Sequence, residues 1–247
     1  MKAMIFAAGL GTRLRPLTDN KPKAMVEING MPLIEIIIRR LKKFGVTDII
    51  VNVHHHANLI IDFLEEKNNF DINIEISDER KLLLSTGGGL SKAKDFFSDG
   101  KPFFVHNVDI LSDIDLKKMY DKHVKSGAVA TLSTRHRATS RYLLFNKKNN
   151  LFGWMNVKTG KMILCKKKKG KLSLRAFSGI HVVSPDLFDA MPEGKEVFSI
   201  IDVYLAAAAY QKIMGYPHEE DEWLDVGKVE NLEEGKGLLD RMGGEFF

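Results

Sequence analysis

The chain has 247 residues, of which 44% are hydrophobic and 28% are charged, and its formal net charge is +5. This length allows one or two domains with a substantial core, and the composition is typical of a soluble globular protein. No apolar stretch is long enough to span a membrane, and the N-terminus lacks a signal-peptide layout. A single cysteine, Cys165, excludes an internal disulfide framework. We expect a cytoplasmic protein with no membrane partner.

Apolar segments of strand length and helix length alternate along the first half of the chain. The alternation predicts βαβ units and a mostly parallel sheet with helices on both faces. The expected strands are residues 3–7, 48–53, 72–76, 102–107 and 128–134, and the expected helices are residues 33–44, 59–64, 87–97 and 116–126.

The pattern changes after Thr134. Residues 141–183 contain short β-like pieces separated by polar turns, which predicts an antiparallel region of hairpins. Helices are expected again at 185–191, 197–210 and 229–242, with short strands at 212–216 and 223–226. Since no linker or low-complexity segment divides the chain, we expect a single domain over residues 1–247, with an inserted β region at about residues 135–183.

The first expected strand runs directly into a glycine-containing, cationic loop. Gly9 and Gly11 allow a tight turn whose exposed N–H groups can bind anions, and Arg13 and Lys23 follow. Gly-x-Gly alone is a weak signal, because neither the dinucleotide fingerprint nor the P-loop pattern is complete. From the residues alone, both a phosphate cradle and a solvated surface turn stay open.

Three further polar segments follow expected elements of this sheet. Glycines open the helix after Thr86, an apolar strand ends near Asp109, and Asp225 lies in a short apolar segment. Ligands of open parallel sheets bind beyond the carboxyl ends of the strands, so these positions are candidates for a site. Taken singly, each aspartate is better interpreted as a cap or turn residue.

The first stretch resembles the signature of the sugar-1-phosphate nucleotidyltransferases, A-A-G-x-G-T-R-L-x-P-L-T followed by P-K-P. Residues 7–18 match it closely, and the later segment departs at Ala24. Residues 86–89 resemble the family's T-G-G-G loop, and residues 223–227 resemble its W-x-D-x-G segment. The resemblance covers essentially the whole chain. It implies the nucleotide-diphospho-sugar transferase fold, a Rossmann-like three-layer α/β sandwich with a mostly parallel mixed sheet.

The resemblance also implies roles for particular residues. Arg13 and Lys23 match the catalytic positions, and Asp109 and Asp225 match the aspartates that bind Mg²⁺. The implied nucleotide-binding residues are Ala8, Gly9, Gly11, Thr12, Thr86, Gly88 and Asn107. The implied sugar-binding residues are Gly179 and Asp202, although Asp202 could also face solvent.

The implied reaction converts a nucleoside triphosphate and a sugar 1-phosphate into a nucleotide sugar and pyrophosphate. A phosphate monoester is largely a dianion at neutral pH, so the attacking group needs no general base. The difficulty is electrostatic, since two unit charges 4 Å apart repel by about 4 kcal/mol at an effective dielectric constant of about 20. Lysine, arginine and magnesium are the groups that would offset this repulsion.

Within the family, the T-G-G-G loop and the short chain most resemble the N-acetylmuramate-1-phosphate uridylyltransferases of cell-wall sugar recycling, which favours UTP. Mannose-1-phosphate guanylyltransferases share much of the pattern and remain an alternative. A non-catalytic, nucleotide-sugar-binding regulatory protein is a further alternative, since Ala24, Ser85 and Val108 depart from the family pattern. We expect a monomer or a homodimer.

Two other features receive simpler interpretations. The net positive charge and the four consecutive lysines at 166–169 are not accompanied by a nucleic-acid-binding motif. We therefore interpret the lysine run as a solvated hairpin tip and expect no nucleic-acid partner. His54, His55 and His56 point in alternating directions at a strand end and lack the Cys/His partners of a closed zinc site.

Overall fold

The computed structural model describes residues 1–167 and 170–243, which group into two compact units. Unit 1 contains Met1–Leu84, Phe103–Ile114 and the chain from Asp221 onward. Unit 2 contains Ser85–Pro102 and Asp115–Glu220. The expectation of a single domain with an insertion at about 135–183 stays a prediction.

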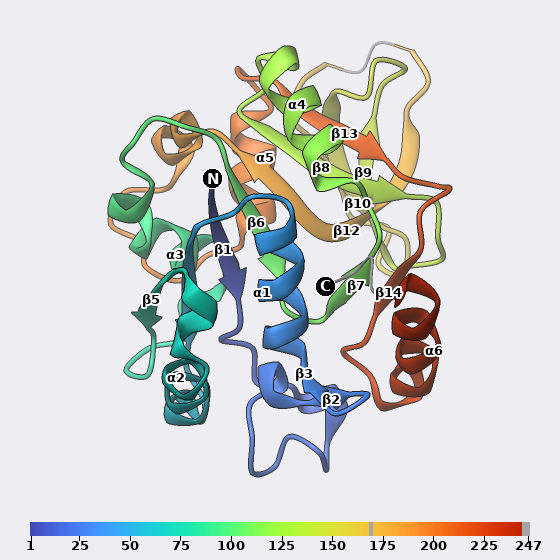
Figure 1. Ribbon diagram of the computed structural model, residues 1–247. Helices are drawn as coiled ribbons and strands as arrows, with labels where there is room; N and C mark the ends of the chain where they lie inside the picture. Colours follow the sequence, from blue (N-terminus) through green and yellow to red (C-terminus); the bar gives the residue numbers. More distant parts are fainter. Residues whose placement is uncertain (168–169, 244–247) are drawn as a thin grey trace. The chain divides into compact units, whose positions relative to one another are not determined.

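Four parallel strands form the central sheet of unit 1, in the order β6-β1-β4-β5 (Figure 1). They are β1 (Lys2–Phe6), β4 (Asp48–Val53), β5 (Asn73–Asp78) and β6 (Phe103–Asn107). β1 lies inside this sheet, and Ala3, Met4 and Ile5 are fully buried. A parallel strand with neighbours on both sides carries a continuous apolar run, which is why this segment was recognisable in the sequence.

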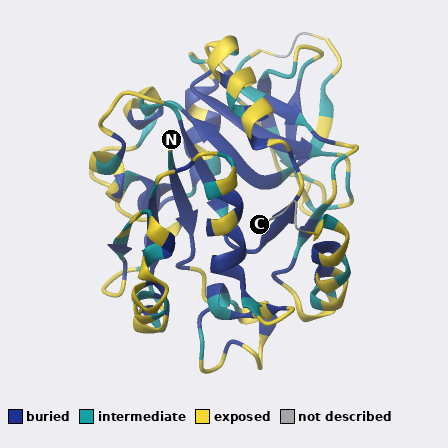
Figure 2. Cartoon of the chain, in the orientation of Figure 1, coloured by how far each residue is buried: buried dark blue, intermediate teal, exposed yellow. Residues whose placement is uncertain are grey.

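Among the described residues of unit 1, the α-helices are α1 (Leu33–Lys43), α2 (Ala57–Glu66) and α6 (Leu232–Met242). α1 is buried around most of its circumference, and even its Arg40 is buried, with a guanidinium N–H donating to the Ile114 carbonyl. Figure 2 shows the contrast with α2 and α6, whose outer turns are exposed. The unit also contains the short 3₁₀ segments η1 (Thr12–Leu14), η2 (Lys23–Met25), η3 (Asn68–Asp71) and η6 (Val229–Asn231).

Unit 1 also contains two small antiparallel pairs, and the second of them joins segments that are far apart in the sequence. β2 (Glu27–Ile28) pairs with β3 (Met31–Pro32), and β7 (Ile110–Ser112) pairs with β14 (Trp223–Asp225). The second pair places Asp225 opposite Ile110, next to the end of β6. The strands β2, β3 and β7 were not predicted, because two or three residues are too few to show a period.

A mixed sheet also forms the centre of unit 2, with the order β11-β10-β9-β12, and β8 pairs with both β12 and β13. β13 runs parallel to β8 and the other pairs are antiparallel, as predicted for residues 141–183. Its strands are β8 (Ala130–Arg135), β9 (Arg141–Phe145), β10 (Leu151–Asn156), β11 (Met162–Leu164), β12 (Ser173–Val183) and β13 (Ile213–Pro217). The predicted hairpin tip at 166–169 lies partly outside the described residues.

The helical segments of unit 2 are α3 (Ser85–Lys92), η4 (Lys94–Phe97), α4 (Leu116–Ser126), η5 (Pro185–Ala190) and α5 (Ile200–Ala207). Among them α4 has its predicted bounds, the segment predicted at 87–97 is divided in two, and those predicted at 185–191 and 197–210 are shorter than predicted. The segment predicted as a helix at 185–191 is a 3₁₀ helix that stops before Met191, whose extended backbone precedes Pro192. The residue before a proline is disfavoured in the helical region, and this limits the segment to a short turn.

A buried histidine gives unit 2 a pH-dependent stability. His123 on α4 is 1% exposed, and its ring nitrogens contact the hydroxyls of Thr131 and Ser184, each at 2.9 Å. Burial lowers the pKa of His123 to about 4. The neutral ring is therefore the form that the folded protein favours.

We expect the free energy of unfolding to fall as the pH drops from about 6.5 toward about 4, because the unfolded chain then binds a proton that folded His123 rejects. Above that window this contribution does not change with pH. Replacing His123 with Gln should reduce the slope by up to about 1.4 kcal/mol per pH unit, measured by urea unfolding at several pH values. Equal slopes for the variant and the wild type would contradict this.

Candidate active site

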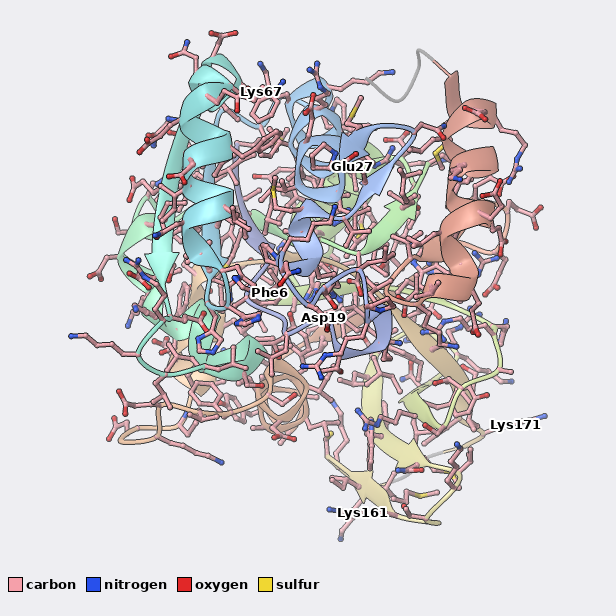
Figure 3. All side chains as sticks on the ribbon, turned by 90° about the horizontal axis from the view of Figure 1, so that it is seen from below. Phe6, Asp19, Glu27, Lys67, Lys161 and Lys171 are labelled. Carbon is pink, nitrogen blue, oxygen red and sulfur yellow. The ribbon has the colours of Figure 1, made fainter. Side chains whose placement is uncertain are left out.

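The loop after β1 presents the predicted catalytic residues. Gly11 adopts a φ of 64°, its carbonyl accepts from Leu14 N at 2.8 Å, and it precedes η1, which carries Thr12 and Arg13. A Cβ at Gly11 would lie 2.9 Å from Thr18 Cγ2, so this turn has neither the backbone freedom nor the space for another residue. Figure 3 labels Phe6 at the end of β1 and Asp19 in the loop, which mark the segment.

A buried amide holds the start of this loop. The Asn52 side chain on β4 is 3% exposed, and its oxygen accepts from Ala7 N at 2.8 Å and Ala8 N at 3.3 Å. Its Nδ2 donates to Glu79 Oε1 at 2.8 Å, and Glu79 Oε2 accepts from Leu84 N at 3.0 Å. Glu79 is only 1% exposed, so this chain of hydrogen bonds is shielded from water.

Asn52 and Glu79 were missed in the sequence analysis. The available signal was a polar residue within the apolar strand Asp48–Val53, where only a hydrogen-bonded side chain is tolerated. The backbone N–H of Ala8, a predicted nucleotide-binding residue, donates a hydrogen bond to the Asn52 side chain. Ala8 is thus positioned by β4.

Two cations and two carboxylates converge in unit 1. Lys23 Nζ lies 2.7 Å from Asp109 Oδ2, and both side chains are largely buried, with exposures of 15% and 8%. Arg13 is 55% exposed, and its guanidinium lies 3.9 Å from Asp109 and 3.8 Å from Asp225. The structure therefore brings together the four residues for which the family resemblance implies roles in catalysis and metal binding.

The short segment after β14 shapes the meeting point of the carboxylates. Val226 N donates to the Asp109 carbonyl at 2.9 Å, and Gly227 N donates to Asp225 Oδ1 at 2.8 Å. A Cβ at Gly227 would lie 2.5 Å from Asp109 Oδ2 and 2.8 Å from Asp225 Oδ1. The absence of a side chain at Gly227 thus leaves room for the two carboxylates and for the Arg13 guanidinium.

This arrangement fits a magnesium ion. Asp109 and Asp225 offer hard carboxylate oxygens, and Lys23 already places a positive charge on one of them. Within 1–167 and 170–243, no three His, Cys, Asp or Glu side chains form a metal-binding group. Magnesium usually binds one or two carboxylates and takes its other ligands from water and phosphate, which suits this donor set.

The histidines near these residues make other contacts. His106, next to Asn107 at the end of β6, is fully buried, and burial lowers its pKa to about 4. It contributes no positive charge at neutral pH. His54 Nδ1 contacts the Glu79 carbonyl at 2.7 Å, and His56 Nε2 contacts the Asp19 carbonyl at 3.3 Å.

Of the remaining predicted residues, Gly9 and Asn107 lie in unit 1 and the others belong to unit 2, where Thr86 and Gly88 pack against the start of α5. Thr86 Oγ1 accepts from Ile200 N at 3.0 Å, and Gly88 N donates to the Phe198 carbonyl at 3.2 Å. The first glycine of the run has a packing reason, since a Cβ at Gly87 would lie 2.5 Å from the Phe198 ring. The ligand roles of Thr86 and Gly88 stay predictions.

The two predicted sugar-binding residues also lie in unit 2. Gly179 has a φ of 82° within β12, at a shift in the pairing register with β8. Asp202 lies in the first turn of α5 and is exposed. Their roles toward a sugar likewise stay predictions.

Residues 2–240 match the protein family described as Nucleotidyl transferase. The N-acetylmuramate alpha-1-phosphate uridylyltransferase of Neisseria meningitidis is 32% identical over 238 residues, 96% of this chain and 98% of the relative. The protein of the same name from Caulobacter vibrioides is 33% identical over 235 residues, 91% of each chain. A crystal structure of HddC from Yersinia pseudotuberculosis complexed with GMP-PN has a TM-score of 0.76 at 21% identity, covering 96% of this chain and 98% of that one. This likeness confirms the expected fold.

We expect Asn52→Ala to lower the free energy of unfolding by about 2–4 kcal/mol, because it leaves the Ala7 N–H and a buried Glu79 oxygen without partners. Urea unfolding measures the change. The matched control is Asn58→Ala, which removes an exposed amide that contacts only Arg80 in the described structure and should change the stability by less than about 0.5 kcal/mol. Equal effects of the two substitutions would contradict the role of the buried amide.

Proposed function

Because this chain belongs to the nucleotidyl transferase family, we propose that it joins UTP to N-acetylmuramate 1-phosphate and releases pyrophosphate. The observation that carries this proposal is the convergence of Arg13, Lys23, Asp109 and Asp225 in unit 1. The substrate pair follows the relatives that match over more than 90% of both chains. The product is a nucleotide sugar, and we place its use in cytoplasmic cell-wall recycling. No helix in 1–167 or 170–243 has the length and apolarity that a membrane crossing needs.

The chain's own residues account for the electrostatics of this reaction. A sugar phosphate oxygen attacks the α-phosphorus of the triphosphate, and pyrophosphate leaves on the opposite side. We assign the β- and γ-phosphates to Arg13, which is half exposed and has a planar set of N–H donors. We assign the α-phosphate and the incoming sugar phosphate to Lys23, whose ammonium is a compact charge on a flexible stem.

Asp109 and Asp225 are the residues that would hold magnesium. The bound ion would neutralise phosphate charge and orient the triphosphate. The carboxylates hold Lys23 and Arg13 beside the residues that would bind the metal, so both cations lie close to the proposed phosphate positions. This preorganisation limits the rearrangement that the reaction requires.

The test is pyrophosphate release from a grid of nucleotides and sugars. UTP, GTP, CTP, ATP and dTTP are each combined with the 1-phosphates of N-acetylmuramate, N-acetylglucosamine, glucose and mannose, with and without Mg²⁺. We expect Mg²⁺-dependent release to be fastest with UTP and N-acetylmuramate 1-phosphate. Fastest release with GTP and mannose 1-phosphate would replace the proposed substrates. Absence of release with every pair, despite bound nucleotide sugar, would favour a regulatory protein.

A further inference from the structure

The positive charge of this chain is concentrated in one segment of unit 2. Residues 122–185 contain 15 lysines and arginines and no aspartate or glutamate. The whole chain has 37 basic and 32 acidic residues, so the rest of the chain carries a net negative charge. A charge asymmetry of this kind indicates an anionic partner, such as a nucleic acid or a membrane surface.

Several lysines of this segment are available to an external anion. Four of them are exposed and form no ion pair within the described residues: Lys158, Lys161, Lys167 and Lys171. By contrast, the exposed Lys117 on α4 lies 3.0 Å from Asp121. Figure 3 labels Lys161 and Lys171, whose side chains extend outward from the strands of unit 2. These ammonium groups face water without a carboxylate to neutralise them.

Exposed aliphatic side chains lie on the same part of the sheet. They are Met162 and Leu164 on β11 and Leu174 on β12. The strand register places Leu164, Gly153, Leu144 and Leu174 in one row across β11, β10, β9 and β12. Residues paired across a sheet share a face, and so do alternate residues of one strand. Met162, Leu164 and Leu174 therefore project from one face of the sheet.

The lysines and the aliphatic side chains are neighbours along the chain. Lys161 directly precedes Met162, Lys167 follows Leu164 by three residues, and Lys171 precedes Leu174 by three. Three residues span at most about 11 Å, so charge and apolar surface adjoin. We call this group the basic hairpin surface: Lys158, Lys161, Met162, Leu164, Lys167, Lys171 and Leu174.

This combination of side chains distinguishes between anionic partners. Proteins bind nucleic acids through phosphate contacts, polar contacts to base edges and aromatic stacking, in which exposed aliphatic side chains have little part. A second copy of this chain would bring the same positive charges, which repel one another. A bilayer with anionic lipids offers negative headgroups and an apolar interior at one surface, and so matches both kinds of side chain.

We propose that the basic hairpin surface binds the surface of a membrane that contains anionic lipids. The ammonium groups contact lipid phosphates, and the aliphatic side chains enter the boundary between headgroups and acyl chains. Peripheral binding of this kind needs no membrane-spanning helix, and it would revise the expectation of no membrane partner. It does not depend on the proposed substrates, because none of these residues belongs to the group around Lys23 and Asp109.

The test is co-sedimentation of the full chain with vesicles of phosphatidylcholine alone, or of equal parts of phosphatidylcholine and phosphatidylglycerol. We expect at least about 10-fold tighter binding to the anionic vesicles, and most of this affinity should be lost in high salt, which screens the lysines. The double variant Lys158→Gln, Lys161→Gln should bind the anionic vesicles about 10-fold more weakly or worse, since each lysine near such a surface contributes about fivefold.

Two further variants separate local from general effects. The matched control is Lys117→Gln, Lys195→Gln, which removes the same charge from other exposed positions of unit 2 and should stay within about twofold of the wild type. Met162→Ser should weaken binding to anionic vesicles by about threefold or more, because the serine side chain has less apolar area to bury. Met162 is exposed, so this change leaves the core intact.

Equal binding to the two kinds of vesicle, or binding to neither, would overturn the inference. An equal loss in the two double lysine variants would overturn it as well, because net charge alone would then explain the binding. Tighter binding to single-stranded RNA than to anionic vesicles, unchanged in Met162→Ser, would assign the surface to nucleic acid. A dimer in sedimentation velocity that Met162→Ser dissociates would assign it to a second copy.

Discussion

A carboxylate that is almost buried must have positive charge or hydrogen-bond donors beside it, and Asp109 is such a group. Lys23 supplies the close charge at 2.7 Å, and Arg13 supplies a more distant one that it shares with Asp225. Both cations come from the loop after β1, whereas the carboxylates come from the end of β6 and from β14. The balance of charge therefore depends on three segments that are far apart in the sequence.

Much of unit 1 serves to hold these segments together. The buried Asn52–Glu79 chain fixes the start of the loop, and the β7–β14 pair places Asp225 beside the end of β6. Gly227 leaves the space that both carboxylates occupy. In this state the cations neutralise the carboxylates, and a metal-bound triphosphate would bring new partners for all four groups. Lysine suits such an exchange, since its flexible stem lets the ammonium move between a carboxylate and a phosphate.

The sequence was informative where a physical requirement leaves a pattern. The apolar run of β1 and the glycines after it were recognisable, because a buried parallel strand and a tight turn require those residue types. The convergence of Asp109 with Asp225 left no periodic signal and was expected only through the family resemblance. Asn52 and Glu79 were missed because their roles depend on contacts between separate strands. The helix expected at 185–191 is a 3₁₀ helix that stops at Ala190, because Pro192 restricts the residue before it.

The most direct test of this account is the rate of pyrophosphate release by Lys23→Ala, beside Lys21→Ala as a matched control. Lys21 is a neighbouring lysine of the same loop, and its ammonium lies 3.9 Å from Glu27, away from the carboxylate pair. Circular dichroism and urea unfolding establish that both variants are folded. The account predicts that Lys23→Ala lowers turnover by about 100-fold or more, and that Lys21→Ala stays within about threefold of the wild type. Near-normal turnover of folded Lys23→Ala would contradict it.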